Sequence, residues 1–238
     1  VTSSDLSHTS ILYTVYNSLP IHSAGYATRT HSLISSIQSS GYTVSAMSRL
    51  GYPNDLKAFR HRAPHEVEDV DGISYFRLSN KEQGHGIIPL DEYLKKYAEE
   101  ISSYCKDNSI GIIHAASNFT NGIASNYAAR SLGIKSIYEV RGLWEVTRMS
   151  MEPDWQKTEH FELIKKLEIE AASGADHVIT LTSALKNELI NRGIPRDKIS
   201  VVPNGVDLDR FKPVSKDVKL KEDLNISEAD IVIGYVGS

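Results

Sequence analysis

The sequence of 238 residues predicts an α/β protein, with a Rossmann-like parallel sheet and helices on both of its faces. Three observations support this fold class. Short apolar, β-branched runs alternate with segments of helical periodicity along most of the chain. Glycines follow several of the predicted helices, at the position where a left-handed residue often ends a helix. A loop of small and polar residues joins the first predicted strand to the first predicted helix, as in a β-α-β unit.

The first β-α unit runs from residue 11 to residue 41. Residues 11–16 are β-branched and aromatic, which favours a buried strand, and an apolar stripe from Tyr26 onward predicts the helix that follows. In open parallel sheets, ligands bind beyond the carboxyl ends of the strands, and a helix N-terminus attracts anions. The loop that contains Ala24 and Gly25 is therefore the first candidate for an anion site.

The glycine in this loop does not complete a known nucleotide-binding motif. Neither G-x-G-x-x-G nor G-x-x-x-x-G-K-[ST] is present in the sequence. A dehydrogenase of the dinucleotide-binding type is therefore disfavoured. A lone glycine before a helix can also simply close a turn, so the local pattern leaves both interpretations open.

The remaining elements follow from the same periodicities. Apolar runs predict further strands at residues 43–47, 73–78, 111–117, 135–140, 176–181 and 199–203. Apolar stripes with capping or stop residues predict helices at residues 90–104, 119–132, 158–173 and 183–192. We expect six to eight strands in one parallel sheet, joined by right-handed crossovers.

Four segments lack a clear period and are predicted to be loops or ends. Residues 1–10 form a polar leader, and residues 49–70 form a long, charged surface loop. Residues 80–89 form a second loop with two glycines, and residues 146–154 form a third, with two methionines and a proline. None of these segments is expected to add a strand or a helix.

Composition bounds the class of protein. With 40% hydrophobic and 24% charged residues, the chain has the composition of a globular protein. Its net charge of −4 gives no reason to expect a nucleic acid as a partner. Cys105 is the only cysteine, so no internal disulfide can form and a cytoplasmic location is expected. No apolar run reaches the length of a membrane span.

No metal site is expected from the histidines of the predicted loops. His61, His65 and His85 lie in such loops, but their spacing matches no metal-ligand motif. We interpret them as solvated loop residues.

Four stretches, in the order of the family, resemble retaining family-four glycosyltransferases of the GT-B fold. Pro-Asn-Gly-Val-Asp at residues 203–207 is similar to the segment that ends their N-terminal domain. Glu-Val-Arg-Gly-Leu-Trp-Glu at residues 139–145 is similar to bacterial polysaccharide-type members, and it is the most specific of the four. Gly-Tyr-x-x-Arg-x-His at residues 25–31 and Ile-His-Ala at residues 113–115 resemble the glycine loop and a following strand end. The resemblance extends over residues 11–238.

The resemblance implies two Rossmann-like domains that face one cleft, with the acceptor on the N-terminal domain and most of the nucleotide-sugar on the C-terminal domain. Residues 11–210 would form the N-terminal domain. Residues 211–238 would form a charged linker and the first strand, at residues 231–236, of a C-terminal domain that is missing here. The chain would then be the acceptor-side half of an enzyme that transfers a sugar with retention to a glycan, lipid or small-molecule acceptor. It would be inactive alone, and the nucleotide-sugar would be a co-substrate with no cofactor required.

The resemblance and the chemistry of transfer together select the candidate site residues. The donor phosphate must be steadied as it leaves, and backbone N–H groups at Ala24 and Gly25 can approach it closely. Trp144 offers a flat face of the kind on which sugars stack. The expected acceptor-binding residues are Tyr26, Arg29, His31, Ser117, Glu139, Arg141, Trp144 and Glu145, and the catalytic candidate is His114.

Several of these residues have a second interpretation. Many relatives carry another histidine two residues after the one that matches His114, but this sequence has Ala116. His114 is therefore either functional or a packed residue at a strand end. Glu139 and Arg141 either contact the acceptor or form an internal ion pair that shapes the loop. Arg29 and its neighbours either bind a ligand or form a solvated first helical turn.

A second class of function is a Rossmann-like module that binds a sugar or nucleotide without chemistry. The enzyme hypothesis implies a nucleotide-sugar, a carbohydrate or lipid-linked acceptor and the protein's own C-terminal domain as partners. A lipid-linked acceptor would place the protein at the surface of the inner membrane. A carboxylate pair in a donor-binding domain beyond residue 238 would favour the enzyme over the binding module.

Overall fold

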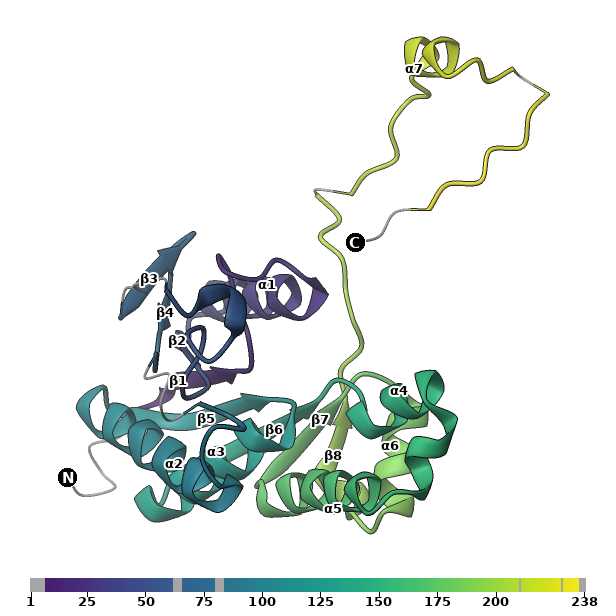
Figure 1. Cartoon of the computed structure of the whole chain (residues 1–238). Helices are drawn as coiled ribbons and strands as arrows, with labels where there is room; N and C mark the ends of the chain where they lie inside the picture. The colour runs from purple at the N-terminus through teal and green to yellow at the C-terminus, as the bar shows by residue number, and fades with distance from the viewer. Residues whose placement is uncertain (1–6, 62–65, 80–83, 210, 228, 236–238) are drawn as a thin grey trace. The chain divides into compact units, whose positions relative to one another are not determined.

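The computed structural model describes residues 7–61, 66–79, 84–209, 211–227 and 229–235. The chain divides into two units, Val1–Pro203 and Asn204–Ser238. The first unit contains an eight-stranded sheet with the strand order β3-β4-β2-β1-β5-β6-β7-β8. Figure 1 shows this sheet with helices packed against it. The predicted α/β class is thus confirmed.

The bounds of the elements are as follows. The strands are β1 (Ser7–Val15), β2 (Thr43–Ser48), β3 (Val67–Val70), β4 (Ile73–Phe76), β5 (Ile110–Ala116), β6 (Lys135–Val140), β7 (His177–Thr180) and β8 (Ile199–Val201). The α-helices are α1 (Gly25–Ser39), α2 (Leu90–Asp107), α3 (Phe119–Leu132), α4 (Trp144–Met151), α5 (Glu159–Gly174), α6 (Ser183–Asn191) and α7 (Val218–Asp223). Short 3₁₀ helices are η2 (Lys57–Phe59), η4 (Pro153–Lys157) and η5 (Arg196–Lys198).

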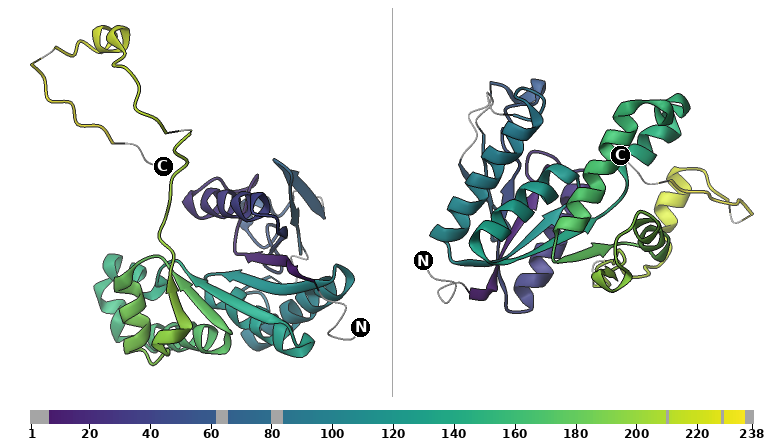
Figure 2. Two further views of the ribbon diagram at one scale, coloured as in Figure 1. Left: turned by 180° about the vertical axis from the view of Figure 1, so that it is seen from behind. Right: turned by 90° about the horizontal axis from the view of Figure 1, so that it is seen from below.

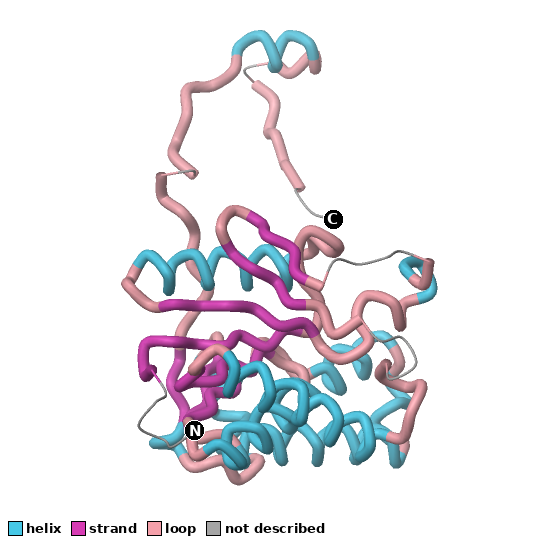
Figure 3. Tube along the Cα trace, turned by 90° about the vertical axis from the view of Figure 1, so that its left-hand side faces the viewer, coloured by secondary structure: helices cyan, strands magenta, loops and turns pink. Residues whose placement is uncertain are grey.

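The sheet separates two apolar layers. On one face, α1 packs on the first strands through a cluster that includes Ile34, Tyr13 and Tyr75. On the other face, α2, α3, α5 and α6 bury the larger part of the core, including Tyr97 and Tyr138. Figures 2 and 3 show the helices on either side of the strands. β2 and then the β3–β4 hairpin lie on one side of β1, and β5 to β8 follow in chain order on the other side, so the middle of the sheet is a topological switch point.

Register decides which side chains share a face. Within β1, Tyr13 packs in the layer under α1, whereas its neighbour Leu12 packs in the layer under α2. Tyr13 pairs with His114 of β5, and Ala116 of the same strand pairs with Glu139 of β6. Since residues two apart on a strand point to the same side, these polar side chains all lie on the α1 face.

Most of the sequence-based elements are confirmed, and so are several helix ends. Thr182 caps α6, where its hydroxyl accepts a hydrogen bond of 3.1 Å from the N–H of Leu185. Gly133 ends α3 with a φ of 68°, and Gly41 follows α1 with a φ of 91°. Only glycine adopts such angles without strain, so these residues mark the ends of the two helices.

The prediction of a surface loop at residues 49–70 is wrong in two respects. Its last residues form β3, which pairs antiparallel with β4 and makes the edge of the otherwise parallel sheet. Its first residues are buried, because the Arg49 guanidinium is paired with Asp55 and stacks over the rings of Tyr16 and Tyr52. An arginine that is ion-paired and stacked on aromatic rings can be buried, so the charge of Arg49 did not indicate a surface position. Residues 62–65 of this segment lie outside the described residues.

The predicted polar leader and the predicted loop at residues 146–154 also differ from the structure. β1 begins at Ser7 rather than at residue 11. Helix α4 covers residues 144–151, and η4 follows it. A buried ion pair of 2.6 Å between Glu145 and Arg192 ties this short helix to the end of α6. Helix α4 is thus held by a partner 47 residues away, which local periodicity does not reveal.

The second unit, residues 204–238, contains the helix α7 and no strand among its described residues. Residues 231–235, the described part of the strand predicted at residues 231–236 for a further domain, have no regular secondary structure here, and residue 236 lies outside the described part. Ile231 and Ile233 are both 91% exposed. A strand needs a neighbouring backbone for its hydrogen bonds, and an apolar β-branched run alone does not supply one.

The described part of the chain contains no helix that is both long and apolar enough to cross a membrane.

Gly122 of α3 packs tightly against β6 and α5, and it gives a stability prediction. A Cβ atom at Gly122 would lie 2.7 Å from Cε2 of Tyr138 and 2.8 Å from Cβ of Ala171. We expect Gly122→Ala to lower the free energy of unfolding by about 1–3 kcal/mol, as measured by urea denaturation, because the helix must move away from the sheet. Gly25→Ala is the control, since nothing lies within 4 Å of its added Cβ. Equal stability of the two variants would contradict the prediction.

Candidate functional site

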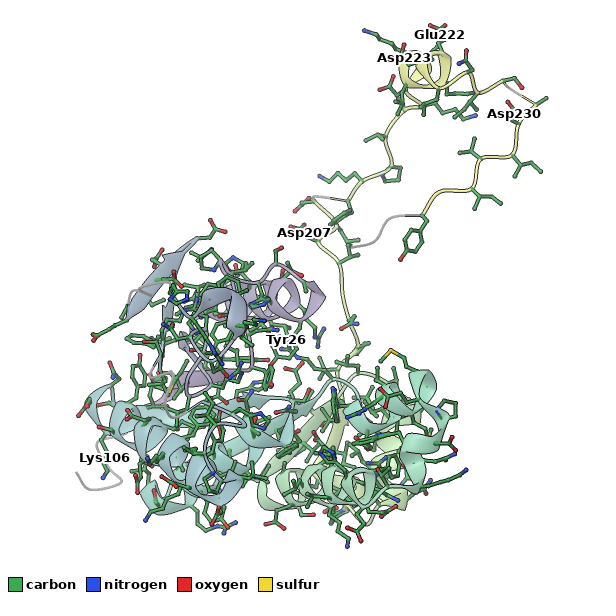
Figure 4. The ribbon with its side chains drawn as sticks, in the orientation of Figure 1. Tyr26, Lys106, Asp207, Glu222, Asp223 and Asp230 are labelled. Atoms are coloured by element: carbon green, nitrogen blue, oxygen red, sulfur yellow. The ribbon has the colours of Figure 1, made fainter. Side chains whose placement is uncertain are left out.

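A pocket of about 700 Å³ opens at the carboxyl edge of the sheet, at the end of the strands near the switch point. The loops after β1, β5 and β6 and the start of α1 form its polar side, and α4, α5 and residues 85–90 form the rest. Its lining residues are Tyr16, Asn17, Tyr26, His85, Gly86, Ile88, Leu90, Tyr93, Ser117, Asn118, Phe119, Arg141, Gly142, Trp144, Thr147, His160, Leu163, Ile164, Leu167 and Glu168. Figure 4 shows Tyr26 at the start of α1, facing the strand ends, whereas Lys106 lies at the far end of α2.

The loops that form the polar side are joined to one another. The N–H of Ser117 donates to the carbonyl of Glu139 at 2.9 Å, and the N–H of Arg141 donates to Oγ of Ser117 at 3.3 Å. These two hydrogen bonds connect the loop after β5 with the loop after β6. Ser117 and Arg141 therefore lie at the same edge of the sheet.

Arg141 connects the same edge to helix α1. Its Nη1 donates to the carbonyl of Tyr26 at 3.1 Å and to Oγ1 of Thr30 at 2.7 Å. Its Nη2 donates to the hydroxyl of Tyr13 at 3.1 Å, and its guanidinium lies 4.6 Å from the centre of the Tyr26 ring. The N–H of Tyr16 in turn donates to the Tyr26 hydroxyl at 3.1 Å. The start of α1 is therefore held rigidly at the pocket.

Glu139 is the buried centre of this polar network. Its carboxylate accepts hydrogen bonds from Nη2 of Arg141 at 2.9 Å, from Nη2 of Arg29 at 2.8 Å and from the hydroxyl of Tyr13. Burial alone would raise the pKa of Glu139, but its contact with His114 and the charge of Arg141 outweigh burial and hold the pKa well below its usual value. Glu139 is therefore ionised throughout the physiological pH range.

The network has more positive than negative charge. Arg29 and Arg141 carry two positive charges and Glu139 carries one negative charge, so these three residues together carry one surplus positive charge. The interpretation of Glu139 and Arg141 as an internal ion pair that shapes the loop agrees with these contacts. Only Arg141 of the three also lines the pocket.

His114 lies beneath this network and does not line the pocket. Its ring stacks on Tyr13 with 4.2 Å between the ring centres, and its Nε2 lies 3.5 Å from Oε2 of Glu139. The structure thus places His114 as a packed residue of β5 that faces α1, which was the second interpretation of its sequence position. Ala116, two residues later on the same face, is fully buried.

Ala24 and Gly25 lie at the exposed start of α1. Ala24 is the N-cap, and its side chain cannot cap the helix. The first turn contains no acidic residue. The space in front of Gly25 is empty, and its φ is not positive, so neither packing nor backbone strain requires a glycine there.

The remaining predicted residues divide between the pocket and other places. Ser117 and Trp144 line the pocket. His31 points to the β3–β4 turn, where its Nδ1 lies 3.0 Å from the Tyr75 hydroxyl and its Nε2 lies 3.2 Å from Asp71. Glu145 is fully buried in its ion pair with Arg192. The structure therefore brings Tyr26, Ser117, Arg141 and Trp144 together around one cavity.

Glu168, which was not among the predicted site residues, is a buried carboxyl group that also lines the pocket. It accepts a hydrogen bond of 3.0 Å from the N–H of Phe119 and one of 2.5 Å from the hydroxyl of Tyr138. Burial raises the pKa of Glu168 to about 7, although both hydrogen bonds lower it. One signal could have indicated it, because residue 168 lies one turn after the buried residue 164 and so falls on the core side of α5.

Within the described ranges, no group of three or more histidine, cysteine, aspartate or glutamate side chains is placed to bind a metal ion.

Comparison with known proteins identifies the class to which this fold and site belong. The family described as Glycosyltransferase Family 4 matches residues 24–210. This match covers more than half of the chain, and the chain belongs to that family. Mannosylfructose-phosphate synthase from Agrobacterium fabrum is 27% identical over 182 residues, which cover 71% of this chain and 40% of that protein.

Solved structures show the same architecture. Sucrose-phosphate synthase from Thermosynechococcus elongatus matches 92% of this chain and 53% of its own length, with a TM-score of 0.66 and 19% identity. The HepE protein of Anabaena in complex with UDP-glucose matches 92% of this chain and 50% of its own length, with a TM-score of 0.56 and 16% identity. At these identities the likeness establishes the fold, the Rossmann-like N-terminal half of GT-B. The chain spans about half the length of the proteins that it matches.

Proposed function

We propose that this chain forms the acceptor-side half of a glycosyltransferase that uses a nucleotide-sugar as donor. The observation that carries the proposal is the pocket at the carboxyl edge of the sheet, where Tyr26, Ser117, Arg141 and Trp144 come together in a family-four glycosyltransferase chain. The HepE structure, which holds UDP-glucose, supports a nucleotide-sugar as donor. The donor-binding half would come from further sequence of the same protein.

The proposed reaction is a sugar transfer with retention at the anomeric carbon. An oxygen of the acceptor forms a bond to the anomeric carbon, and the bond between that carbon and the nucleotide phosphate oxygen breaks. The acceptor proton is released, and the nucleotide leaves with the electron pair. The positive end of the α1 dipole and the surplus charge of Arg29 and Arg141 would stabilise the negative charge on the leaving phosphate.

Trp144 and the polar loop ends would orient the acceptor. The indole of Trp144 is 47% exposed at the pocket, where it can stack on a sugar ring. Glu139 acts through Arg29 and Arg141, which it positions. Positioning of this kind contributes strongly to the rate of a two-substrate reaction.

A cytoplasmic location is part of this proposal, and the single cysteine, Cys105, is buried and free.

The test is a transfer assay on the full product of the gene, with a panel of nucleotide-sugars and acceptors. We expect transfer, and we expect Gly25→Ala to lower kcat/KM at least ten-fold, because its Cβ would occupy the space through which the donor phosphate approaches. The fold should tolerate this change, since nothing lies within 4 Å of that Cβ. Ser32→Ala, an exposed change on the same helix, is the control and should leave kcat/KM unchanged.

Two outcomes would contradict the proposal. Binding of nucleotide-sugars without any transfer by the full gene product would favour a non-catalytic binding module. Transfer by the 238-residue chain alone, at the rate of the full product, would show that this half contains a complete active site. We expect the chain alone to give no transfer.

A further inference from the structure

The side of the pocket that faces α5 is mostly apolar, although His160 and Glu168 of the same helix also line it. Leu163, Ile164 and Leu167 of α5 line it, together with Phe119 at the start of α3 and Leu90 at the start of α2. The polar groups of Ser117, Asn118 and Arg141 line the pocket at the strand ends. The pocket therefore has one apolar and one polar side, and a ligand that fills it must match both.

The apolar side is open to solvent where it reaches the mouth of the pocket. Leu163 is 50% exposed, and Trp144, which also lines the pocket, is 47% exposed. Single exposed apolar side chains are common, but a group of them around one cavity indicates a binding surface for an apolar partner. Covering Leu163 and its neighbours with an apolar group would remove this surface from water.

The charge of the polar side favours an anion or a hydroxyl-rich group. Arg29, Arg141 and Glu139 together carry one surplus positive charge, and only Arg141 of them reaches the pocket wall. Glu168, on the apolar side, has a pKa of about 7 and so is largely neutral below neutral pH. The negative and polar end of a ligand is therefore directed to the strand ends, and its apolar part is directed to α5.

We propose that the acceptor of this protein is an amphiphile, with an alkyl or isoprenoid chain that packs on Leu90, Leu163 and Leu167 and a polar end at Ser117 and Arg141. This inference rests on the proposed function and narrows its acceptor to molecules with an apolar chain. A purely polar sugar would leave the α5 side of the pocket in contact with water.

The test measures how affinity depends on chain length. Inorganic phosphate and the methyl, butyl, hexyl and octyl phosphates are titrated into the protein by calorimetry, each below its micelle concentration. We expect the Kd to fall roughly three- to four-fold for each added methylene group that becomes buried, and at least 100-fold from methyl to octyl phosphate.

Leu163→Gln separates the apolar side from the rest of the pocket. Leu163 is half exposed, so its replacement should leave the fold intact, and we expect it to raise the Kd of octyl phosphate about five- to ten-fold without changing that of inorganic phosphate. Val67→Gln is the matched control, since Val67 is 45% exposed on the strand β3 and does not line the pocket. Thermal unfolding of all three proteins checks that the variants are folded.

Each remaining outcome has a defined meaning. A Kd that does not depend on chain length, or equal effects of the two variants, would overturn the proposal. Binding to anionic vesicles but not to monomeric octyl phosphate would also overturn it, and would indicate a membrane-contact surface instead. Chain-length dependence without any sugar transfer by the full gene product would contradict the proposed function and leave the apolar subsite standing. Transfer to acceptors regardless of chain length would contradict only the present inference.

Discussion

Replacement of Glu139 by glutamine should lower the free energy of unfolding by about 3–5 kcal/mol. The variant keeps the shape of the side chain but removes the carboxylate that Arg29 and Arg141 share; their side chains are 16% and 8% exposed. Two guanidinium groups that are largely out of water would then lose their common ion-pair partner. Urea denaturation followed by circular dichroism measures the effect.

Two comparisons test the cause of this loss. Glu99→Gln removes a charge from the exposed face of α2 and should change stability by no more than about 0.5 kcal/mol. Adding Arg29→Gln to Glu139→Gln restores the original charge surplus, so the double variant should be less destabilised than the sum of the two single changes. Strict additivity would show that the charges of Arg29 and Glu139 do not interact.

The pH dependence of the same variant has a defined sign. The pKa of Glu139 is lower in the folded state than in the unfolded state. Its stabilising contribution is therefore present above the unfolded pKa of about 4.5 and is lost as the pH falls below it. The difference in stability between the natural protein and Glu139→Gln should shrink as the pH is lowered from 5 toward 3.

Glu168 should make the protein less stable at high pH, which is the opposite dependence. Its pKa rises from 4.5 to about 7 on folding, because the carboxyl group is buried between α3, α5 and β6. The stabilising contribution is present below pH 4.5 and is lost as the pH rises through about 7. The difference between the two pKa values corresponds to about 3 kcal/mol, which should be lost between pH 4.5 and pH 8.

Glu168→Gln isolates this contribution, because glutamine resembles the protonated carboxyl group. Its amide oxygen can accept from the N–H of Phe119, and its amide nitrogen can donate to the Tyr138 hydroxyl. Stability curves at several pH values should show a decline for the natural protein that is absent or smaller in the variant. His22 and His85, whose pKa values are lowered on folding, contribute equally to the pH dependence of both proteins. The difference between the two stability curves therefore does not contain their contribution. Parallel curves for the two proteins would contradict the assignment.

The order of strands and helices in the sheet domain could be predicted from the sequence. Apolar residues recur with the period of a strand or helix because one face is buried, and this period is visible in the local sequence of β6 and α2. The same holds for helix ends, where Thr182 and Gly133 act on the backbone within a few residues. The loop ends after β5 and β6 could also be predicted to share an edge with the start of α1, because strands of a parallel sheet end on the same side.

Only the tertiary structure decided which of the candidate residues face the pocket and which form ion pairs with one another. Glu139 meets Arg29 from 110 positions away, and Glu145 meets Arg192 from 47 positions away. Such pairs depend on strand register and on the crossing of a helix over the sheet, neither of which leaves a local pattern in the sequence. The burial of Arg49, the formation of α4 and the position of Glu168 at the pocket have the same origin. A charged residue can be buried when a distant partner compensates its charge, and only the folded chain brings that partner to it.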